Sequence, residues 1–313
     1  MNEVLVVALG GNALQRGNGP ADADSQLAVV HQTAEQLVKI ISSGQKMAIV
    51  HGNGPQVGRI VLQNEAASGI TPAMPFDVCG AMSQGMIGYH IQQALGEKMK
   101  LAGLKDSPVT LVTQVRVDGE DPAFQNPTKP IGPFYTKEEA ERLKAEKGYA
   151  VKEDSGRGWR RIVASPIPVE IVELDQVKAM LSAGFVPITA GGGGIPVVQS
   201  GEGHKGVAAV IDKDLAAWRL AEGLEAKTLL ILTEVENACL NFGKENQQVL
   251  TKVLAREMRE YHKEGHFASG SMGPKVDAAL RFVEGGPGRR AVITRLDLAL
   301  EGLEGLRGTE ICS

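Results

Sequence analysis

The sequence has little cysteine and no large excess of charge of either sign. Its 313 residues include three cysteines, at positions 79, 239 and 312, which are too few and too scattered for a disulfide framework or a metal cluster. The six histidines show no HExxH or other metal-ligand spacing, so no protein-bound metal is expected. The formal net charge of −4 argues against nucleic acid as the main partner, because proteins that bind it usually carry a basic patch.

Long apolar runs are also missing from the chain. No uninterrupted stretch reaches the length of a membrane-spanning helix, and the first residues lack the basic and apolar regions of a signal peptide. We therefore expect a cytoplasmic protein that has no membrane contact. Hydrophobic residues make up 43% and charged residues 22% of the chain, a composition typical of a globular protein with a large core.

Glycine-rich turns follow three apolar, β-branched runs, in VLVVALGGNA, MAIVHGNGPQVG and FVPITAGGGGIPVV. Each run is typical of a buried parallel strand. Open α/β sheets bind ligands just outside the carboxyl ends of their strands, and glycine there lets backbone N–H groups approach an anion. None of the turns fits the Walker pattern or the GxGxxG spacing of dinucleotide folds. The three turns therefore predict a site for a polyanion whose positive charge comes from elsewhere in the chain.

Strands and helices alternate along most of the sequence, which predicts a parallel sheet covered on both faces. A first helix is expected over 25–44, where Asp24 can act as the cap, and a longer one over 78–102, interrupted by four glycines. Further helices are expected over 173–183, 250–264 and 274–284. The expected strands include VTLVTQVRV as one strand, KTLLILTEV, RAVITR and a hairpin that begins with IPVVQSG.

The alternation stops between about 118 and 168. This segment is rich in proline, glycine and charged residues, and it includes the strand-like WRRIVAS. Thr136 and Glu139 have the spacing of a capping box at the start of a short helix. We expect a small protruding subdomain near the active site, in a chain whose two functional lobes divide near 164–173.

Three lysines stand out by their surroundings. Lys129 lies between two prolines in NPTKPIGPF, Lys213 lies between Asp212 and Asp214 before a helix, and Lys275 follows a GSMGP turn. Lysines and helix N-termini both favour phosphate, and phosphoryl transfer needs positioned positive charge rather than covalent chemistry. The pattern alone leaves open that Lys129 and Lys275 are solvated surface residues, and that Lys213 only compensates its two aspartates.

Other polar residues in these segments also have two interpretations. Asn12, His51 and Asn53 either contact a ligand or only form the glycine turns in which they lie. Ser271 either donates to a phosphate or caps a helix, and Asp214 either pairs with the lysines or favours the helix dipole. The methionines at 74, 82 and 86 are expected in the core or in a subunit interface rather than in a cofactor site.

Taken together, these segments resemble the carbamate kinases of the amino acid kinase superfamily. The resemblance spans essentially the whole chain and rests on ALGGNAL, HGNGPQVG, TQVxVD, NPTKPIGPF, GRGWRRIVASP, AGGGGIPV, AVIDKDLAA and EGHFxxGSMGPK. The GGN start and the GGGG turn are shared across the superfamily, whereas NPTKPIGPF and GRGWRRIVASP are more particular to carbamate kinases. The resemblance implies a three-layer αβα sandwich around a mostly parallel sheet with a small protruding subdomain, usually as a homodimer.

The resemblance also implies a reaction. Carbamate kinases convert ATP and carbamate reversibly into ADP and carbamoyl phosphate, with Mg²⁺ bound to the nucleotide. They commonly run towards ATP in arginine or purine-derived nitrogen catabolism. An N-terminal lobe of residues 1–168, with the inserted subdomain at about 118–168, would hold carbamate or carbamoyl phosphate. A C-terminal lobe of residues 169–313 would bind ADP or ATP, and no protein ligands for the metal are implied.

Site residues follow from the same match. Lys129 would reach the phosphoryl group from the protruding subdomain. Lys213 and Lys275 would contact it from the nucleotide side, and Asp214 would organise the lysines. The turns around the acyl-phosphate site match Gly10, Gly11, Asn12, Gly52, Asn53 and Gly54. Nucleotide binding is assigned to Gly191, Gly192, Lys213, Ser271 and Lys275. The adenine surroundings match residues 232–248, without individual contacts.

The chain departs from the expected family pattern in two places. Where HFPPGSMLPK is expected, it has HFASGSMGPK, and Ala268, Ser269 and Gly273 should loosen the loop before the last lysine. Glu234 and Glu236 add charge near the nucleotide, which would alter nucleotide preference. The alternatives to a carbamate kinase are a related kinase with a larger acceptor, such as acetylglutamate, aspartate or UMP, and a non-catalytic sensor of nucleotide or carbamoyl phosphate.

Overall fold

An eight-stranded sheet forms the centre of the protein. The computed structural model describes residues 3–15, 22–154, 156, 158–268 and 270–313. The strand order is β15-β17-β16-β12-β1-β2-β9-β3, and the six strands from β16 to β3 are parallel, while β17 and β15 run the other way. The bounds are β1 Val4–Leu9, β2 Lys46–His51, β3 Ser107–Thr110, β9 Phe185–Ile188, β12 Thr228–Thr233, β15 Lys252–Leu254, β16 Arg290–Arg295 and β17 Thr309–Cys312.

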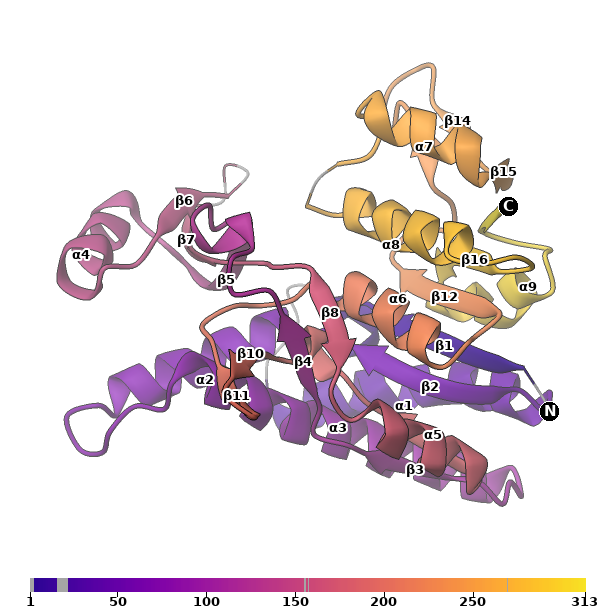
Figure 1. The fold of residues 1–313 in the computed structure, drawn as a ribbon, viewed down its shortest axis with the longest axis horizontal. Helices are drawn as coiled ribbons and strands as arrows, with labels where there is room; N and C mark the ends of the chain where they lie inside the picture. Colours follow the sequence, from indigo (N-terminus) through magenta and orange to yellow (C-terminus); the bar gives the residue numbers. More distant parts are fainter. Residues whose placement is uncertain (1–2, 16–21, 155, 157, 269) are drawn as a thin grey trace.

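Helices cover both faces of this sheet, with α6 and α8 in front and α1 and α3 behind in Figure 1. Side chains of β1 alternate between the two sides: Val6 and Ala8 share a buried cluster with α5, α6, α7 and α8, and Leu5, Val7 and Leu9 share another with α1, α3 and α9. This arrangement confirms the expected three-layer sandwich. The bounds are α1 Ala23–Ser42, α2 Gly54–Ala66, α3 Phe76–Leu101, α5 Leu174–Ser182, α6 Lys213–Gly223, α7 Ala255–Lys263, α8 Met272–Glu284 and α9 Ala299–Leu303.

Smaller sheets lie beside the central one. A four-stranded sheet has the order β11-β10-β4-β8, with β4 Gln114–Val117, β8 Pro168–Ile171, β10 Ile195–Ser200 and β11 Gly203–Gly206. A three-stranded sheet has the order β5-β7-β6 and carries helix α4, with β5 Lys129–Tyr135, α4 Lys137–Lys147, β6 Val151–Glu153 and β7 Trp159–Val163. A last pair joins β13 Cys239–Leu240 to β14 Gln248–Val249. The three-stranded sheet and α4 form the small protruding subdomain, which projects at the left of Figure 1.

Two predicted helix starts have different outcomes. The Thr136 hydroxyl accepts a hydrogen bond from Glu139 N, and the Glu139 carboxylate accepts one from Thr136 N, so the capping box of α4 is confirmed. The predicted cap of α1 is wrong by two residues. Asp22 is the cap, and its carboxylate accepts from Ser25 N at 2.9 Å, whereas Asp24 lies in the first helical turn.

VTLVTQVRV forms two strands rather than the one expected, because β3 belongs to the central sheet and β4 to the four-stranded sheet. The chain crosses between the sheets at Thr113. The Thr113 N–H donates to Gln84 Oε1 at 2.9 Å, and the Thr113 carbonyl accepts from Gln84 Nε2 at 3.0 Å. The Thr113 carbonyl also accepts from Ile195 N at 2.9 Å, so a buried glutamine of α3 and one backbone partner together satisfy the crossover.

Two further expectations about helices need correction. The helix predicted over 250–264 begins only at Ala255, because Lys252–Leu254 pair with β17 as an edge strand. Helix α3 runs through its glycines for 26 residues without interruption. Gly88 lets it lie against Thr110, since a Cβ there would come within 2.3 Å of the Thr110 methyl group. Neither α3 nor any other helix in the described part of the chain is long and apolar enough to cross a membrane.

Candidate active site

The first two glycine turns meet at one edge of the central sheet. They follow β1 and β2, which are neighbours in the strand order, and β9 with the third turn lies next to β2. Gly52 N donates to Leu9 O at 3.2 Å, and Gly10 N donates to Leu232 O at 3.1 Å. A Cβ at Gly10 would approach Leu232 O to 2.9 Å, so glycine is needed for this close contact with β12. The predicted convergence of the turns at the carboxyl ends of the strands is therefore confirmed.

The third turn packs directly against the second. A Cβ at Gly191 would lie 2.4 Å from His51 Nε2, and a Cβ at Gly192 would lie 2.2 Å from Asn53 Nδ2. Asn53 Nδ2 also donates to Ser83 Oγ at 2.8 Å, which fixes the amide of this buried side chain. Contacts within the protein therefore fix the side chains of His51 and Asn53, because Gly191 and Gly192 pack directly against them.

Three lysines and two aspartates lie together where α6 begins. Asp214 is 2% exposed and pairs with two lysines: Lys213 Nζ donates to its Oδ1, and Lys275 Nζ donates to its Oδ2 at 3.1 Å. Lys129 Nζ, from the protruding subdomain, donates to Asp212 Oδ2 at 2.6 Å. The structure thus brings the three predicted lysines close to the aspartate that was predicted to organise them, but Lys129 pairs with Asp212 and not with Asp214.

Burial and neighbouring charges both shift the pKa values of these groups, and each ion-pair partner opposes the effect of burial. Burial lowers the pKa of Lys213, and the nearby Lys275 adds to this effect, while Asp214 opposes it. Burial alone would lower the pKa of Lys275, but its ion pair with Asp214 raises it. Burial alone would raise the pKa of Asp212, but the ammonium groups of Lys129 and Lys213 hold it well below its usual range. Three ammonium groups facing two carboxylates leave one excess positive charge for an anion.

Asp212 is a site residue that the sequence reasoning missed. It was interpreted only as charge compensation for Lys213, yet its ion-pair partner is Lys129. Its Oδ1 also accepts from Asp214 N at 2.9 Å, so it is the N-cap of α6. The available signal was the D-x-D spacing immediately before a helix, where the first aspartate is a preferred cap.

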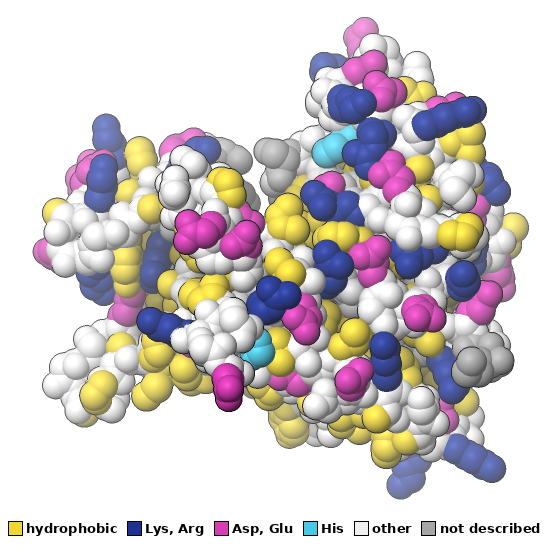
Figure 2. All heavy atoms as spheres, viewed as in Figure 1, with side chains coloured by type: hydrophobic (Ala, Val, Ile, Leu, Met, Phe, Trp, Pro, Cys, Tyr) yellow, Lys and Arg dark blue, Asp and Glu magenta, His cyan; other side chains and the backbone are white. Residues whose placement is uncertain are grey.

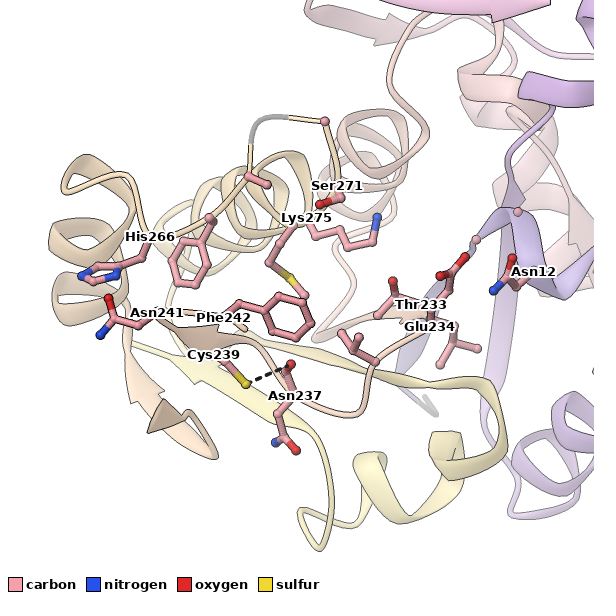
Figure 3. A pocket seen from close by; sticks show the side chains of 18 of the residues that line it. Asn12, Thr233, Glu234, Asn237, Cys239, Asn241, Phe242, His266, Ser271 and Lys275 are labelled. Carbon is pink, nitrogen blue, oxygen red and sulfur yellow. Dashed lines mark hydrogen bonds between the residues drawn. The ribbon is translucent and has the colours of Figure 1, made fainter. Parts of the chain in front are cut away.

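A cavity of about 920 Å³ opens beside this network, a size suited to a nucleotide. Figure 3 shows Lys275 and Ser271 on one side and Asn12, Thr233 and Glu234 on the other. The predicted residues in its lining are Gly10, Gly11, Asn12, Lys213, Ser271 and Lys275, together with nine residues of the segment 232–248 that was predicted to surround adenine. The lining does not include Lys129, Gly52, Asn53, Gly54, Gly191 or Gly192. Figure 2 shows a deep notch between the protruding subdomain and the part of the molecule that carries α7 and α8.

Comparisons with known proteins agree with this geometry. The model of the amino acid kinase family matches residues 3–295. The chain belongs to the amino acid kinase family. It is 51% identical to a carbamate kinase of Pyrococcus furiosus over 313 residues, 99% of each chain, and 51% identical to a carbamate kinase-like protein of Escherichia coli over 315 residues, 100% of each. Its fold matches carbamate kinase from Giardia lamblia bound to AMP-PNP with a TM-score of 0.93 and 45% identity, covering 99% and 98% of the two chains.

Within this member of the amino acid kinase family, the loop before Lys275 departs from the expected pattern. Gly273 N donates to Ala268 O at 2.9 Å, and Ser271 N donates to the same oxygen at 3.2 Å. A Cβ at Gly273 would come within 3.0 Å of that oxygen, so a bulky residue would need a different backbone. Ser269 lies outside the described residues. Ser271 is the N-cap of α8, but its side chain makes no capping bond, so the capping interpretation of its hydroxyl is wrong.

The two unusual acidic residues have different surroundings. Glu236 pairs with Arg307 at 3.4 Å and is not in the lining of the cavity. Glu234 lines the cavity, and its charge helps to raise the pKa of Lys275. No ion-pair partner of Glu234 is found among the residues that the structure describes. In Figure 3 its carboxylate lies beside Asn12, so a carboxylate and a side-chain amide face the cavity together.

The buried His51 predicts a pH dependence of stability. Its Nδ1 donates to Gly52 O at 2.8 Å, and burial lowers its pKa to about 4. The unfolded chain takes up a proton near pH 6.5 and the folded chain only near pH 4, so stability is complete above pH 6.5 and is lost as the pH falls through this window. Between pH 7.5 and pH 5 this group should remove about 2 kcal/mol from the free energy of unfolding.

Urea denaturation at the two pH values tests this expectation. The neutral variant His51→Gln should show a pH dependence that is smaller than that of the parent protein by about 2 kcal/mol. The comparison uses the change with pH in each protein, so an overall cost of the substitution does not affect it. Equal pH dependence in the two proteins would contradict a neutral, buried His51.

Proposed function

We propose that this chain is a carbamate kinase, which transfers a phosphoryl group reversibly between ATP and carbamate. The observation that carries the proposal is the grouping of three lysines around Asp212 and Asp214, at the carboxyl ends of the strands and beside a cavity of nucleotide size. Three relatives with which the chain shares about half of its residues are named carbamate kinases and match it over nearly its whole length.

The chemistry requires positioning and charge rather than a general base, because carbamate is already an anionic nucleophile. In a loose transition state the transferred group carries charge on its equatorial oxygens. Lys213 and Lys275 line the nucleotide cavity and would stabilise this charge from the nucleotide side. Lys129 would approach from the protruding subdomain, and the N-termini of α6 and α8 add positive potential.

Magnesium fits the cavity as an ion carried mainly by the nucleotide. Among the described residues, no group of three or more His, Cys, Asp or Glu side chains could hold a metal by itself. The carboxylate of Glu234 and the amide oxygen of Asn12 would hold Mg²⁺, directly or through its water shell. The bound ion would neutralise charge on the nucleotide phosphates.

The acceptor site is proposed at the second glycine turn, which lies outside the cavity lining, while the first turn lines the cavity and would lie between the two sites. The Gly10 and Gly52 N–H groups already donate to Leu232 O and Leu9 O, so the other N–H groups of the two turns, at residues 11, 12, 53 and 54, would bind the acceptor. The buried Asn53 and His51 hold the second turn rigid. Residues 1–168 would then supply the carbamate side and residues 169–313 the nucleotide side. The packing of Gly191 and Gly192 supports a role in holding the second turn, and their assignment to nucleotide binding stays a prediction.

An exposed apolar stripe on α3 supports a homodimer. Val78, Met82 and Tyr89 lie on one face of this helix, and Tyr89 is 61% exposed. Ile70, which is 93% exposed, lies nearby in sequence in the segment between α2 and α3. A monomer would leave this apolar area in water, whereas a second copy of the chain would cover it. Cytoplasmic location stays a prediction from the composition of the sequence, and a net flux towards ATP in nitrogen catabolism stays a prediction from the family resemblance.

Formation of ATP from carbamoyl phosphate and ADP, with and without Mg²⁺, tests the proposed function. Magnesium-dependent ATP formation is the expected result. A folded protein that forms no ATP from carbamoyl phosphate, but phosphorylates acetylglutamate, aspartate or UMP, would be a related kinase with another acceptor. Binding of ADP without turnover of any of these substrates would instead indicate a sensor.

A further inference from the structure

We propose that Asp212 is a positioning residue, which holds Lys129 of the protruding subdomain in place at the start of α6. The proposal deepens the proposed function, since it assigns the partner that places one of the three lysines for phosphoryl transfer. It rests on two contacts of one carboxylate. Oδ2 accepts from Lys129 Nζ at 2.6 Å, and Oδ1 accepts from Asp214 N at 2.9 Å.

The two oxygens connect elements that are far apart in sequence. Lys129 is the first residue of β5 in the subdomain, and Asp212 is the N-cap of α6 in the central layers. Its cap bond fixes the orientation of the carboxylate, so Oδ2 presents a fixed acceptor to the lysine. The side chain of Asp212 is 13% exposed and that of Lys129 is 34% exposed, so the pair is only partly screened by water.

Backbone and apolar contacts hold the two partners at this distance. Lys129 pairs with Val163 of β7, and the residue after β7, Ala164, forms a bridge with Ala209 and accepts from Val210 N at 2.9 Å. Ile131, Val163 and Val210 form a small buried cluster. The base of the subdomain is therefore joined to the segment that leads directly into Asp212.

The contact has a specific consequence for catalysis. A free lysine has many rotamers, and fixing it costs side-chain entropy when the transferring phosphoryl group must be stabilised. Asp212 orders the ammonium group of Lys129 before substrate arrives, next to the Lys213–Asp214–Lys275 group. Its negative charge also weakens the attraction of the site for an anionic substrate in the ground state. Loss of Asp212 should therefore lower kcat without raising KM for carbamoyl phosphate.

Two substitutions separate this role from capping. Asn and Ser are both good N-caps, so Asp212→Asn and Asp212→Ser keep the start of α6 while they remove the charge that holds Lys129. We expect each variant to lower kcat about tenfold, with KM for carbamoyl phosphate unchanged or lower. In a Lys129→Ala background the same substitutions should cause less than a further twofold change, because their target is already missing.

A second readout does not depend on turnover. Hydrogen exchange of the amides of residues 128, 129, 131, 163 and 164 should accelerate equally in Asp212→Ser, in Lys129→Ala and in the double variant. A full additional loss of kcat in the Lys129→Ala background, or exchange rates equal to those of the parent protein, would overturn the proposal. A parent protein that forms no ATP would refute the proposed function, while the exchange comparison would still decide whether Asp212 holds Lys129.

Discussion

Replacing Lys213 with alanine is expected to lower the rate of ATP formation from carbamoyl phosphate and ADP by about 10²–10³-fold, the typical loss for one preorganised electrostatic group. Lys213, like Lys275, lines the proposed nucleotide cavity and pairs with the buried Asp214, and in addition its Cδ would lie 3.4 Å from a Cβ at Gly52 of the second turn. It therefore lies between the proposed acceptor site and the nucleotide. Without it, the excess positive charge of the network disappears.

Steady-state kinetics of Lys213→Ala, with the exposed Lys100→Ala at the end of α3 as the matched control, test this expectation. Both variants lose one positive charge, but only Lys213 touches the site. The loss should appear mainly in kcat, because the charge it stabilises develops in the transition state. Turnover of Lys213→Ala within a few-fold of the parent protein would remove this lysine from the proposed mechanism.

Replacing Gly193 with alanine is expected to destabilise the protein by at least about 3 kcal/mol, through backbone strain and overpacking. Gly193 has φ +92°, and a Cβ there would lie 2.1 Å from the carbonyl oxygen of Ile211. The obstacle is backbone, which cannot rotate away as a side chain can. Ile211 directly precedes Asp212, so any relaxation of this clash displaces the start of α6 and should also lower activity.

Gly44→Ala provides the matched control for this prediction. Gly44 has a similar φ of +87°, but a Cβ there would meet no described atom within 4 Å. Its cost should therefore be only that of the left-handed conformation, about 1 kcal/mol. Urea denaturation followed by tryptophan fluorescence measures both variants. Equal destabilisation of the two would show that φ alone, and not the contact with Ile211, explains the need for glycine at position 193.

Local sequence signals explain which parts of the fold and site were predictable. The apolar run with its glycine turn predicted β1, β2 and β9, and the Thr136–Glu139 spacing predicted the start of α4, because these patterns act within a few residues. Local patterns also predicted that Lys213 and Lys275 lie at helix starts and that Lys129 lies between two prolines. They left open whether Asp214 pairs with the lysines or only favours the helix dipole, and the resemblance to a family of kinases favoured the pairing.

Local sequence patterns did not predict the features that depend on contacts between residues far apart in the chain. The crossover at Thr113 depends on Gln84, and the partner of Asp212 is Lys129, 83 residues away in the chain. The short strand Lys252–Leu254 exists because it pairs with β17 near the C-terminus, and no local pattern separates it from the first turn of a helix. Tertiary contacts therefore overrode local preference at these positions.

The position of β1 in the strand order also constrains how the chain is made. This first strand pairs on one side with β2, but on the other side with β12, where Leu5 lies opposite Thr228. During synthesis, one edge of β1 therefore stays unpaired until most of the chain has left the ribosome. The hydrogen bond from Gly10 N at the end of β1 to Leu232 O also cannot form before then. A nascent chain that ends before β12 would present an open sheet edge and no phosphoryl-transfer site, which makes it a natural substrate for chaperones and proteases.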